Sequence, residues 1–446
     1  MGNQRAQASG GPRTKLLSIH RPHTTPTKHL QMTTNTRRLA AEALEQWHAG
    51  HHYAESLIDH AARKHKLSRE DRNLLNALVI GSIRNQRLLD HWIAQLRDGD
   101  IDLQVRCHLR VGLLQLYILG LPDHAAVNET VDSARKGIRG LINAVLRRAI
   151  REREPLLDSV EALPAPVRLS HPDWLVNRWT SQWGAEMTAS LLDWNQKSSL
   201  TSFRSNPLKP EAQETLDASE LAVSMPDHPG FYITKKGLPP RDWIEEGLIY
   251  IQDPATTHSV KLLAPSAGET VLDACAAPGG KATQIAAAMR NTGKLLCTDS
   301  NEKRLPRLQR NLERLGIEIS STAAFDWTQA PPSEWHQRFD AILLDVPCSN
   351  TGVMRKRIDA RWRMTPENIT QVAEIQSKIL SNAAQCLKPG GRIVYSTCSI
   401  EHEENQEQIS RFLAAYPNFE LKQQQAIHPA THQTDGAYAA LLVKAP

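Results

Sequence analysis

Hydrophobic residues recur at helical spacing from the stretch TTNTRRLAAEALEQW to about residue 154. In RCHLRVGLLQLYIL, for example, Leu109, Leu113 and Leu116 fall on one face, as they do in a helix that packs into a core. Short breaks such as LRDGDID separate these runs. The pattern predicts an all-α helical bundle over residues 32–154.

A different pattern begins at residue 249, where short apolar runs alternate with helical segments. The runs are VLDACA, KLLCTDS, FDAILLDVPC and GGRIVYSTCS. Between them, segments such as EKRLPRLQRNLERLG place leucines on one helical face. Buried strands alternating with helices predict a doubly wound, Rossmann-like α/β domain over residues 249–446.

The remaining segments carry weaker patterns. Residues 155–170 contain three prolines and little periodicity, which predicts a linker. Helical stretches and strand-like pieces then alternate, so we expect residues 155–248 to hold this linker and a small α+β module. Residues 1–31 have five basic and no acidic residues and no apolar period, which predicts a disordered basic arm.

The length of 446 residues is enough for two or three domains. An apolar run of about 18 residues, which a membrane span needs, is missing from the sequence, and so are the features of a signal peptide. We therefore expect a cytoplasmic protein without a membrane partner. The six cysteines form no CxxC pair and no zinc-like spacing with histidine, so we expect reduced thiols and no metal site. We assign Cys107, Cys297 and Cys386 to packing.

Basic residues are concentrated in the first third of the chain. Residues 1–154 hold 24 Lys and Arg against 15 Asp and Glu, whereas the rest holds 29 against 33. This distribution is expected if the first part binds a polyanion and the second contains the catalytic site. A solvated basic surface would give the same distribution. In the last predicted helix of the bundle, Arg147 and Arg148 belong to a basic stripe that is a candidate RNA contact.

Acidic residues and cysteines stand where the predicted strands end. They are Asp273, Asp299, Asp345, Cys348 and Cys398. In a doubly wound sheet the ligand binds beyond the carboxyl ends of the strands, so these residues mark the candidate site. An isolated cysteine is usually a packing residue, but two cysteines at strand ends favour a chemical role.

The stretch VLDACAAPGGKATQIA turns from a strand into a helix through two glycines. Gly279 and Gly280 allow a ligand to approach closely, and the new helix offers unpaired N–H groups. Asp299 ends the next strand, 19 residues beyond Gly280, where an acid accepts both hydroxyls of a ribose. Because the GxGxxG spacing of a dinucleotide site is missing, we expect a nucleoside cofactor without a pyrophosphate. Asp326, at the expected end of the third strand, is either a contact to an adenine edge or a turn residue.

The set DACAAPGGK, LLCTDS, AAFDW, LLDVPCSNTGV and YSTCS resembles the S-adenosylmethionine-dependent RNA cytosine-5 methyltransferase family over about residues 245–446. The stretches LLQLYILGLPDHAAVNETV and RGLINAVLRR resemble the RNA-binding fold of the antitermination factor NusB. Together they are similar to the B-type 16S ribosomal RNA methyltransferases of the Fmu/Sun group. The resemblance implies S-adenosyl-L-methionine as cofactor and 16S rRNA as substrate, at the 967-type site. We expect a monomer that acts on free or early-assembly RNA.

The resemblance also implies a role for each site residue. Carbon 5 of cytosine is a poor nucleophile until a thiolate adds to carbon 6, and by resemblance that thiolate belongs to Cys398. Asp345 then interacts with N3 and the exocyclic amine, Cys348 is needed for release, and Lys281 faces the pocket. The implied cofactor-binding residues are Cys275, Ala276, Ala277, Pro278, Gly279, Gly280, Lys281, Asp299, Asp326 and Asp345.

A basic loop, GVMRKRIDARW, follows Cys348. Within it Arg355, Arg357 and Arg361 are predicted to hold phosphates that flank the target base. The chain departs from the family here, since many members have His-Pro in place of Arg357-Ile358, and the segment TDGAYAALLVK lacks one aromatic of the common DGFF pattern. Both departures bear on the shape of the substrate pocket.

Two alternatives stay open at this point. One is a cytosine-5 methyltransferase that acts on tRNA or on another ribosomal site, and the NusB-like stretches favour 16S rRNA over it. The other is a noncatalytic RNA-binding or assembly factor with the same fold. The presence of Asp345, Cys348 and Cys398 together disfavours the noncatalytic alternative.

Overall fold

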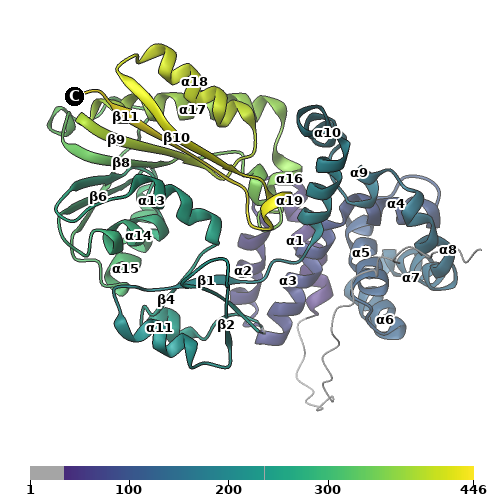
Figure 1. The fold of residues 1–446 in the computed structure, drawn as a ribbon. Coiled ribbons are helices and arrows are strands. Elements are labelled where there is room, and N and C mark those ends of the chain that lie inside the picture. The colour runs from purple at the N-terminus through teal and green to yellow at the C-terminus, as the bar shows by residue number, and fades with distance from the viewer. Residues whose placement is uncertain (1–34, 236) are drawn as a thin grey trace, which may run out of the picture.

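The structure is a computed structural model that describes residues 35–235 and 237–446 (Figure 1). The predicted arm over residues 1–31 lies outside the described residues. Among the helices that are described, none combines the length and the apolar character needed to cross a bilayer.

Helices α1 to α7 form the predicted bundle (Figure 1). Their apolar stripes meet in one core that includes Leu44, Leu78, Trp92 and Leu146, and Cys107 is buried there as a packing residue. The prediction of an all-α domain is therefore confirmed. The helices are α1 (Thr36–His48), α2 (Ala54–Lys64), α3 (Arg69–Arg84), α4 (Gln86–Leu96), α5 (Leu103–Leu113), the π-helical turn η1 (Leu114–Ile118), α6 (Asp123–Ser133) and α7 (Lys136–Arg151).

The predicted linker over residues 155–170 is wrong, because this segment is largely helical. It contains most of α8 (Arg153–Asp158), η2 (Ser159–Ala162) and α9 (Ala165–Arg168), and α10 (Asp173–Gln196) follows directly. Pro164 is the N-cap of α9 and Pro166 lies in its first turn. A proline at the start of a helix forfeits no intrahelical hydrogen bond, so these prolines mark a helix start.

The α+β module contains a four-stranded antiparallel sheet with the order β2-β3-β1-β4. Its elements are β1 (Ser202–Ser205), α11 (Pro210–Asp217), β2 (Ala222–Ser224), β3 (Phe231–Thr234), α12 (Arg241–Glu245) and β4 (Ile249–Ile251). Because β4 pairs with β1, the module extends three residues past the predicted boundary at residue 248.

The C-terminal domain is built on a seven-stranded sheet with the order β10-β11-β9-β8-β5-β6-β7, in which β11 runs antiparallel to both of its neighbours. Leu272, Ile342 and Ile393 pack against α17 and α18, whereas the alternate residues pack against α13, α14 and α15 on the other face (Figure 1). The prediction of a doubly wound α/β domain is confirmed, and Cys297 and Cys386 are buried in its two faces. The elements are η3 (Pro254–Thr256), α13 (Thr257–Leu263), β5 (Thr270–Asp273), α14 (Gly280–Ala288), β6 (Lys294–Asp299), η4 (Glu302–Arg304), α15 (Leu305–Arg314), β7 (Ser320–Ala324), η5 (Ser333–Trp335), β8 (Phe339–Asp345), η6 (Thr351–Val353), α16 (Ala360–Arg363), α17 (Pro366–Gln385), β9 (Leu387–Thr397), η7 (His402–Glu404), α18 (Gln406–Ala415), β10 (Phe419–Ile427), α19 (Pro429–His432) and β11 (Ala437–Lys444).

Residues 355–363, which follow the Cys348 loop, dock this domain onto the helical bundle. Ile358 is 1% exposed and belongs to the core of the bundle. Asp359 accepts hydrogen bonds from Trp47 Nε1 at 2.6 Å and from the Ala54 amide at 3.1 Å. We call residues 355–363 the docking segment.

Candidate active site

Four neighbouring parallel strands bring the predicted residues to one edge of the sheet. Asp273, Asp299 and Asp345 are the last residues of β5, β6 and β8, and Cys398 follows β9. In the sheet these strands lie in the order β9-β8-β5-β6, and Asp345 stands opposite Ser396 of β9. Because the strands run in the same direction, their final residues meet at the same edge.

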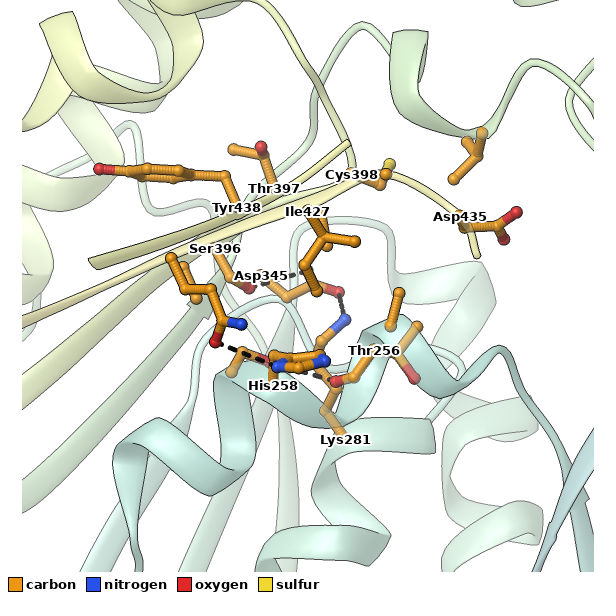
Figure 2. Close-up of a pocket in the computed structure, with 17 residues that line it drawn as sticks. Thr256, His258, Lys281, Asp345, Ser396, Thr397, Cys398, Ile427, Asp435 and Tyr438 are labelled. Carbon is orange, nitrogen blue, oxygen red and sulfur yellow. Dashed lines mark hydrogen bonds and ion pairs between the residues drawn. The ribbon is translucent and has the colours of Figure 1, made fainter. Parts of the chain in front are cut away.

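A pocket opens at this edge, as Figure 2 shows. Lys281 from α14, Asp345 from β8 and Cys398 after β9 line it. Its other walls come from α13, β10 and β11, where a ring nitrogen of His258 and Gln425 Oε1 are 3.2 Å apart. Ala437 also lines the pocket, so the departure from the DGFF pattern falls inside the site.

Two of the residues that line the pocket form an ion pair. Lys281 Nζ donates a hydrogen bond to Asp345 Oδ2 at 2.6 Å, and Ser396 Oγ donates to Oδ1 at 3.2 Å. Burial by itself lowers the pKa of Lys281, but the charge and the hydrogen bond of Asp345 outweigh it and the net shift of the pKa is upward. Lys281 is therefore an ammonium that can share a proton with Asp345 inside the pocket.

The two cysteines are in direct contact, with their sulfur atoms 2.9 Å apart. Asn350 holds both: its Oδ1 accepts a hydrogen bond from Cys398 Sγ at 3.3 Å, and its Nδ2 donates to the Cys348 carbonyl at 2.9 Å. The hydrogen bond with Cys398, followed by burial, raises the pKa of the Cys348 thiol well above its usual range. Cys348 is therefore a protonated thiol in contact with the Cys398 sulfur, and either sulfur can be the donor of their hydrogen bond.

The loop over residues 275–281 crosses the end of the sheet, where the Ala276 amide donates to the Thr298 carbonyl at 2.8 Å. Gly279 has a φ of 106°, in the left-handed region that favours glycine. A Cβ on Gly280 would come within 2.8 Å of the Tyr250 ring, so this glycine also serves packing inside the protein. Burial raises the pKa of the Cys275 thiol well above its usual range, which agrees with a role for Cys275 through its backbone.

Asp273 ends β5 just before this loop and is fully buried, and neither of its carboxylate oxygens has a hydrogen-bond partner among the residues that the structure describes. Burial, and then the negative charge of Asp345, raise its pKa to about 7. A buried carboxylate without a partner is unfavourable, and a cationic ligand would relieve it. S-adenosylmethionine carries an ammonium and a sulfonium group, so the buried carboxylate fits this cofactor.

The two other acidic candidates differ in their surroundings. Asp299 is 5% exposed, and its Oδ1 accepts from the Asn301 amide at 2.9 Å while Oδ2 lies 4.0 Å from Arg304. Asp326 is exposed, and its Oδ1 accepts from both the amide and the hydroxyl of Thr328 at 2.9 Å. The turn role of Asp326 is thus present, and the contacts of Asp299 to a ribose and of Asp326 to an adenine stay predictions.

The predicted RNA-binding arginines fall into two groups. Arg147 and Arg148 on α7 and Arg357 in the docking segment are exposed. Arg357 lies 3.6 Å from Glu55, and both side chains are more than 60% exposed. Phosphate contacts by these three residues stay predictions.

The prediction for Arg361 is corrected by its burial. Its guanidinium is 0% exposed and donates to the backbone carbonyls of Arg84, Ser170 and Asn195 at 3.1 Å. Arg355 is only 13% exposed and stacks on the Trp194 ring at 4.0 Å. These two arginines hold the domains together, and a local basic pattern cannot distinguish such a role from phosphate binding.

Two residues near the site were missed by the sequence analysis. Glu404, in the acidic run EHEEN, is fully buried next to both cysteine loops. Asp435 lines the pocket and accepts a hydrogen bond from Lys356 Nζ at 2.8 Å. Burial, and then the charge of Asp253, raise the pKa of Asp435 to about 6. The TDGAY motif was a usable signal for Asp435. The sequence held no such signal for Glu404, because an acidic run normally indicates an exposed helix start.

Three parts of the chain match known protein families. Residues 260–443 match the family described as 16S rRNA methyltransferase RsmB/F, and residues 34–151 match the NusB family. Residues 171–222 match the ferredoxin-like domain of RsmF/B-like methyltransferases.

Whole-chain comparisons agree with these matches. "Probable ribosomal RNA small subunit methyltransferase B" of Bacillus subtilis (strain 168) is 33% identical, over 87% of this chain and 90% of its own length. The ribosomal RNA small subunit methyltransferase B of Klebsiella pneumoniae (strain 342) is 34% identical, over 92% of this chain and 98% of its own. The solved structure of PH0851 is 26% identical with a TM-score of 0.74, and covers 94% of this chain and 100% of its own. The chain belongs to the RsmB/F family of S-adenosylmethionine-dependent 16S rRNA methyltransferases.

Proposed function

We propose that the protein methylates carbon 5 of a cytosine in 16S rRNA, at the 967-type site, through a covalent adduct between a cysteine and carbon 6. The observation that carries the proposal is the arrangement of the two cysteines. Cys398 lines the pocket beside Lys281 and Asp345. Cys348 lies outside the pocket lining, with its sulfur 2.9 Å from that of Cys398. One sulfur is therefore placed to attack a base and the other to assist it.

The residues of the pocket have complementary tasks in this reaction. Cys398 first loses its thiol proton to solvent and then, as a thiolate, forms a bond to carbon 6, so that electron density moves toward N3 and carbon 5. Lys281 and Asp345 share a proton that is supplied to N3, which neutralises the developing charge. S-adenosyl-L-methionine, when bound, supplies an electrophilic methyl group for carbon 5.

Release requires a base, because carbon 5 then carries both a methyl group and its original proton. The hydrogen bond with Cys398 is the largest cause of the raised pKa of Cys348. Once the Cys398 sulfur is bonded to carbon 6 it is a weaker acceptor, so Cys348 can lose its proton to solvent. The Cys348 thiolate then takes the carbon-5 proton, and the bond from Cys398 to carbon 6 breaks with its electron pair left on sulfur. The N3 proton returns to Lys281 and Asp345, and the Cys398 thiolate regains a proton from solvent, so both sulfurs return to their starting states.

The two cysteines can be separated by a trapping experiment. Cys398→Ala should abolish methylation and form no covalent protein–RNA complex, because carbon 6 is not attacked. Cys348→Ala should attack and methylate but fail to release, so a denaturant-resistant complex should accumulate with the cofactor present. A denaturing gel with 16S rRNA fragments and S-adenosylmethionine measures both outcomes, and Cys107→Ala, a buried cysteine in the helical bundle, is the control.

Three results would contradict the proposal. They are a complex in Cys398→Ala, no complex in either variant while the wild type turns over, and methylation at a position other than carbon 5. Bisulfite sequencing of 16S rRNA and of tRNA from a deletion strain tests the target. Loss of a protected cytosine in tRNA alone would favour the tRNA alternative.

A further inference from the structure

We propose that Glu404 is a positioning residue that holds the two cysteine loops together and so sets the separation of the two sulfur atoms. The catalytic consequence rests on the function proposed above. The structural part does not, because it concerns only the distance between two side chains in the free protein.

Glu404 ends η7 and is 0% exposed, and both of its carboxylate oxygens are hydrogen-bonded. Oε1 accepts from the Ser349 hydroxyl and, at 2.5 Å, from the Ser399 hydroxyl. Oε2 accepts from the Ser349 amide and from Gln376 Nε2, both at 2.9 Å. One buried side chain therefore receives four hydrogen bonds.

The donors to Glu404 come from residues next to the two cysteines. Ser349 directly follows Cys348, and Ser399 directly follows Cys398. Gln376 Nε2 also donates to the Pro347 carbonyl at 2.9 Å, so the residues on both sides of Cys348 are held. The carboxylate thus links two loops that are about fifty residues apart in the sequence but adjacent in the site.

An ionised carboxylate accepts from all four of these donors without any rearrangement. An ionised carboxylate is purely an acceptor and offers about four lone-pair sites, whereas an amide of the same shape turns one side into a donor. Glu404→Gln would place its NH₂ group against either the serine hydroxyls or the Ser349 amide and Gln376. If the amide oxygen stays on the Ser349 amide and Gln376, the NH₂ group turns the Ser349 and Ser399 hydroxyls from donors into acceptors. The charge-assisted hydrogen bonds that hold the cysteine loops then become weaker neutral ones, which loosens the link.

The loops have other links, which limit the expected effect. The Gly352 amide donates to the Cys398 carbonyl at 3.0 Å, and Thr351 Oγ1 lies 3.1 Å from Ser399 Oγ. We therefore expect Glu404→Gln to fold and to displace the sulfurs rather than to release the loops. Misplacement by about 1 Å can lower a rate by about 100-fold, so a loss of about tenfold or more is expected here.

The chain supplies a matched control in Glu401. It is also 0% exposed and lies three residues earlier, but its carboxylate accepts from Arg178 and Trp179 of α10 and not from the cysteine loops. Glu401→Gln therefore reproduces the loss of a buried carboxylate without touching the proposed link. Thermal unfolding of both variants shows that they are folded before any comparison is made.

The decisive measurement is the rate of disulfide formation between Cys348 and Cys398 in the free protein, with diamide as oxidant. When the disulfide forms, the two thiols give two electrons and two protons to diamide, which is reduced to the hydrazine. Peptide mapping by mass spectrometry identifies the linked pair of cysteines. We expect Glu404→Gln to slow this reaction by about tenfold or more. We expect Glu401→Gln to stay within about twofold of wild type. In the methylation assay, Glu404→Gln should lower kcat with little change in KM for S-adenosylmethionine.

Ser399→Ala is the second test, because it removes the hydrogen bond from the Ser399 hydroxyl to Glu404. It decides the matter if Glu404→Gln does not fold. A wild-type rate of disulfide formation in a folded Glu404→Gln variant, or in Ser399→Ala where Glu404→Gln fails to fold, would overturn the proposal. Equal slowing in Glu401→Gln would overturn it too. If disulfide formation slows only in Glu404→Gln but no protein form methylates carbon 5, the positioning role stands and the proposed reaction falls.

Discussion

Asp273 and Asp345 end adjacent strands, yet their environments differ. Asp345 has Lys281 Nζ at 2.6 Å, whereas Asp273 is fully buried and has no hydrogen-bond partner within the described part of the chain. When Asp273 is ionised, these two carboxylates share the field of one ammonium group, and the three groups together carry one negative charge in excess. That excess suits a cationic cofactor, and it also determines how the free protein responds to pH.

The pKa of Asp273 is raised to about 7, so the folded protein binds a proton that the unfolded chain releases near pH 4. The stabilisation from this proton is present below about pH 4 and is lost as the pH rises toward 7. A shift of about three units at about 1.4 kcal/mol per unit sets an upper limit of roughly 4 kcal/mol. In urea unfolding without ligand, wild type should lose stability relative to Asp273→Asn between pH 5 and pH 8.

The same variant tests the cofactor assignment. S-adenosylhomocysteine carries the ammonium group but no methyl group, and it should stabilise wild type more than Asp273→Asn at pH 8. A difference in stability that does not change with pH would contradict the buried, unpaired state of Asp273. Equal stabilisation of the two proteins would remove Asp273 from the cofactor site.

Residue patterns could predict part of this site. Asp345 and Cys398 were recognisable because each follows an apolar run and parallel strands end at one edge. Glu404 was not recognisable, since its burial depends on Ser349 and Gln376, which approach it only through the tertiary fold. Arg361 was misjudged for the same reason, because a basic run looks alike whether it faces RNA or a neighbouring domain.

At the scale of elements, the periodicity of apolar residues predicted the helices and strands that bury one face in a core. α15 and the strands β5, β6, β8 and β9 agree with their leucine- and valine-rich patterns. The edge strand β10 was not predicted, because most of its residues are exposed and polar and carry no apolar alternation. The helices that begin at residue 153 were not predicted, because prolines in a segment with little periodicity indicate a linker. In the structure these prolines lie at the starts of helices.

The docking segment is an element whose role depends on its partner. Ile358 is buried in the helical bundle, so Ile358→Ala should lower the free energy of unfolding of that domain by about 2–5 kcal/mol. Arg357→Ala, at the exposed neighbouring position, should change it by less than about 0.5 kcal/mol. Urea unfolding followed by tryptophan fluorescence measures both.

Hydrogen exchange can locate the effect of Ile358→Ala. Protection should fall in the docking segment and in α1 and α2, because Asp359 binds Trp47 and Ala54 there. If protection changed only in the C-terminal domain, the assignment of Ile358 to the core of the bundle would be wrong.

At the scale of the whole molecule, the domain arrangement links a basic region to the active site. The docking segment begins seven residues after Cys348 and contacts the helical bundle. It therefore holds the bundle close to the catalytic pocket of the C-terminal domain. Of the nine excess positive charges in residues 1–154, five lie in residues 1–31 and four in residues 32–154. Whether the bundle itself binds RNA must therefore be tested with the arm in place.

Arg147 and Arg148 on α7 allow that test in the full chain. If each contacts a phosphate, Arg147→Gln/Arg148→Gln should weaken binding to a 16S rRNA fragment and lower the slope of log K against log salt. The reduction should be about 0.7 to 0.9 per lost contact, because fewer counterions are released. Arg241→Gln/Arg310→Gln removes two exposed arginines from α12 and α15 and is the control for net charge. A slope that falls equally in both double variants would show that α7 is a solvated basic face, and a slope that falls only in the α7 variant would place RNA on the bundle.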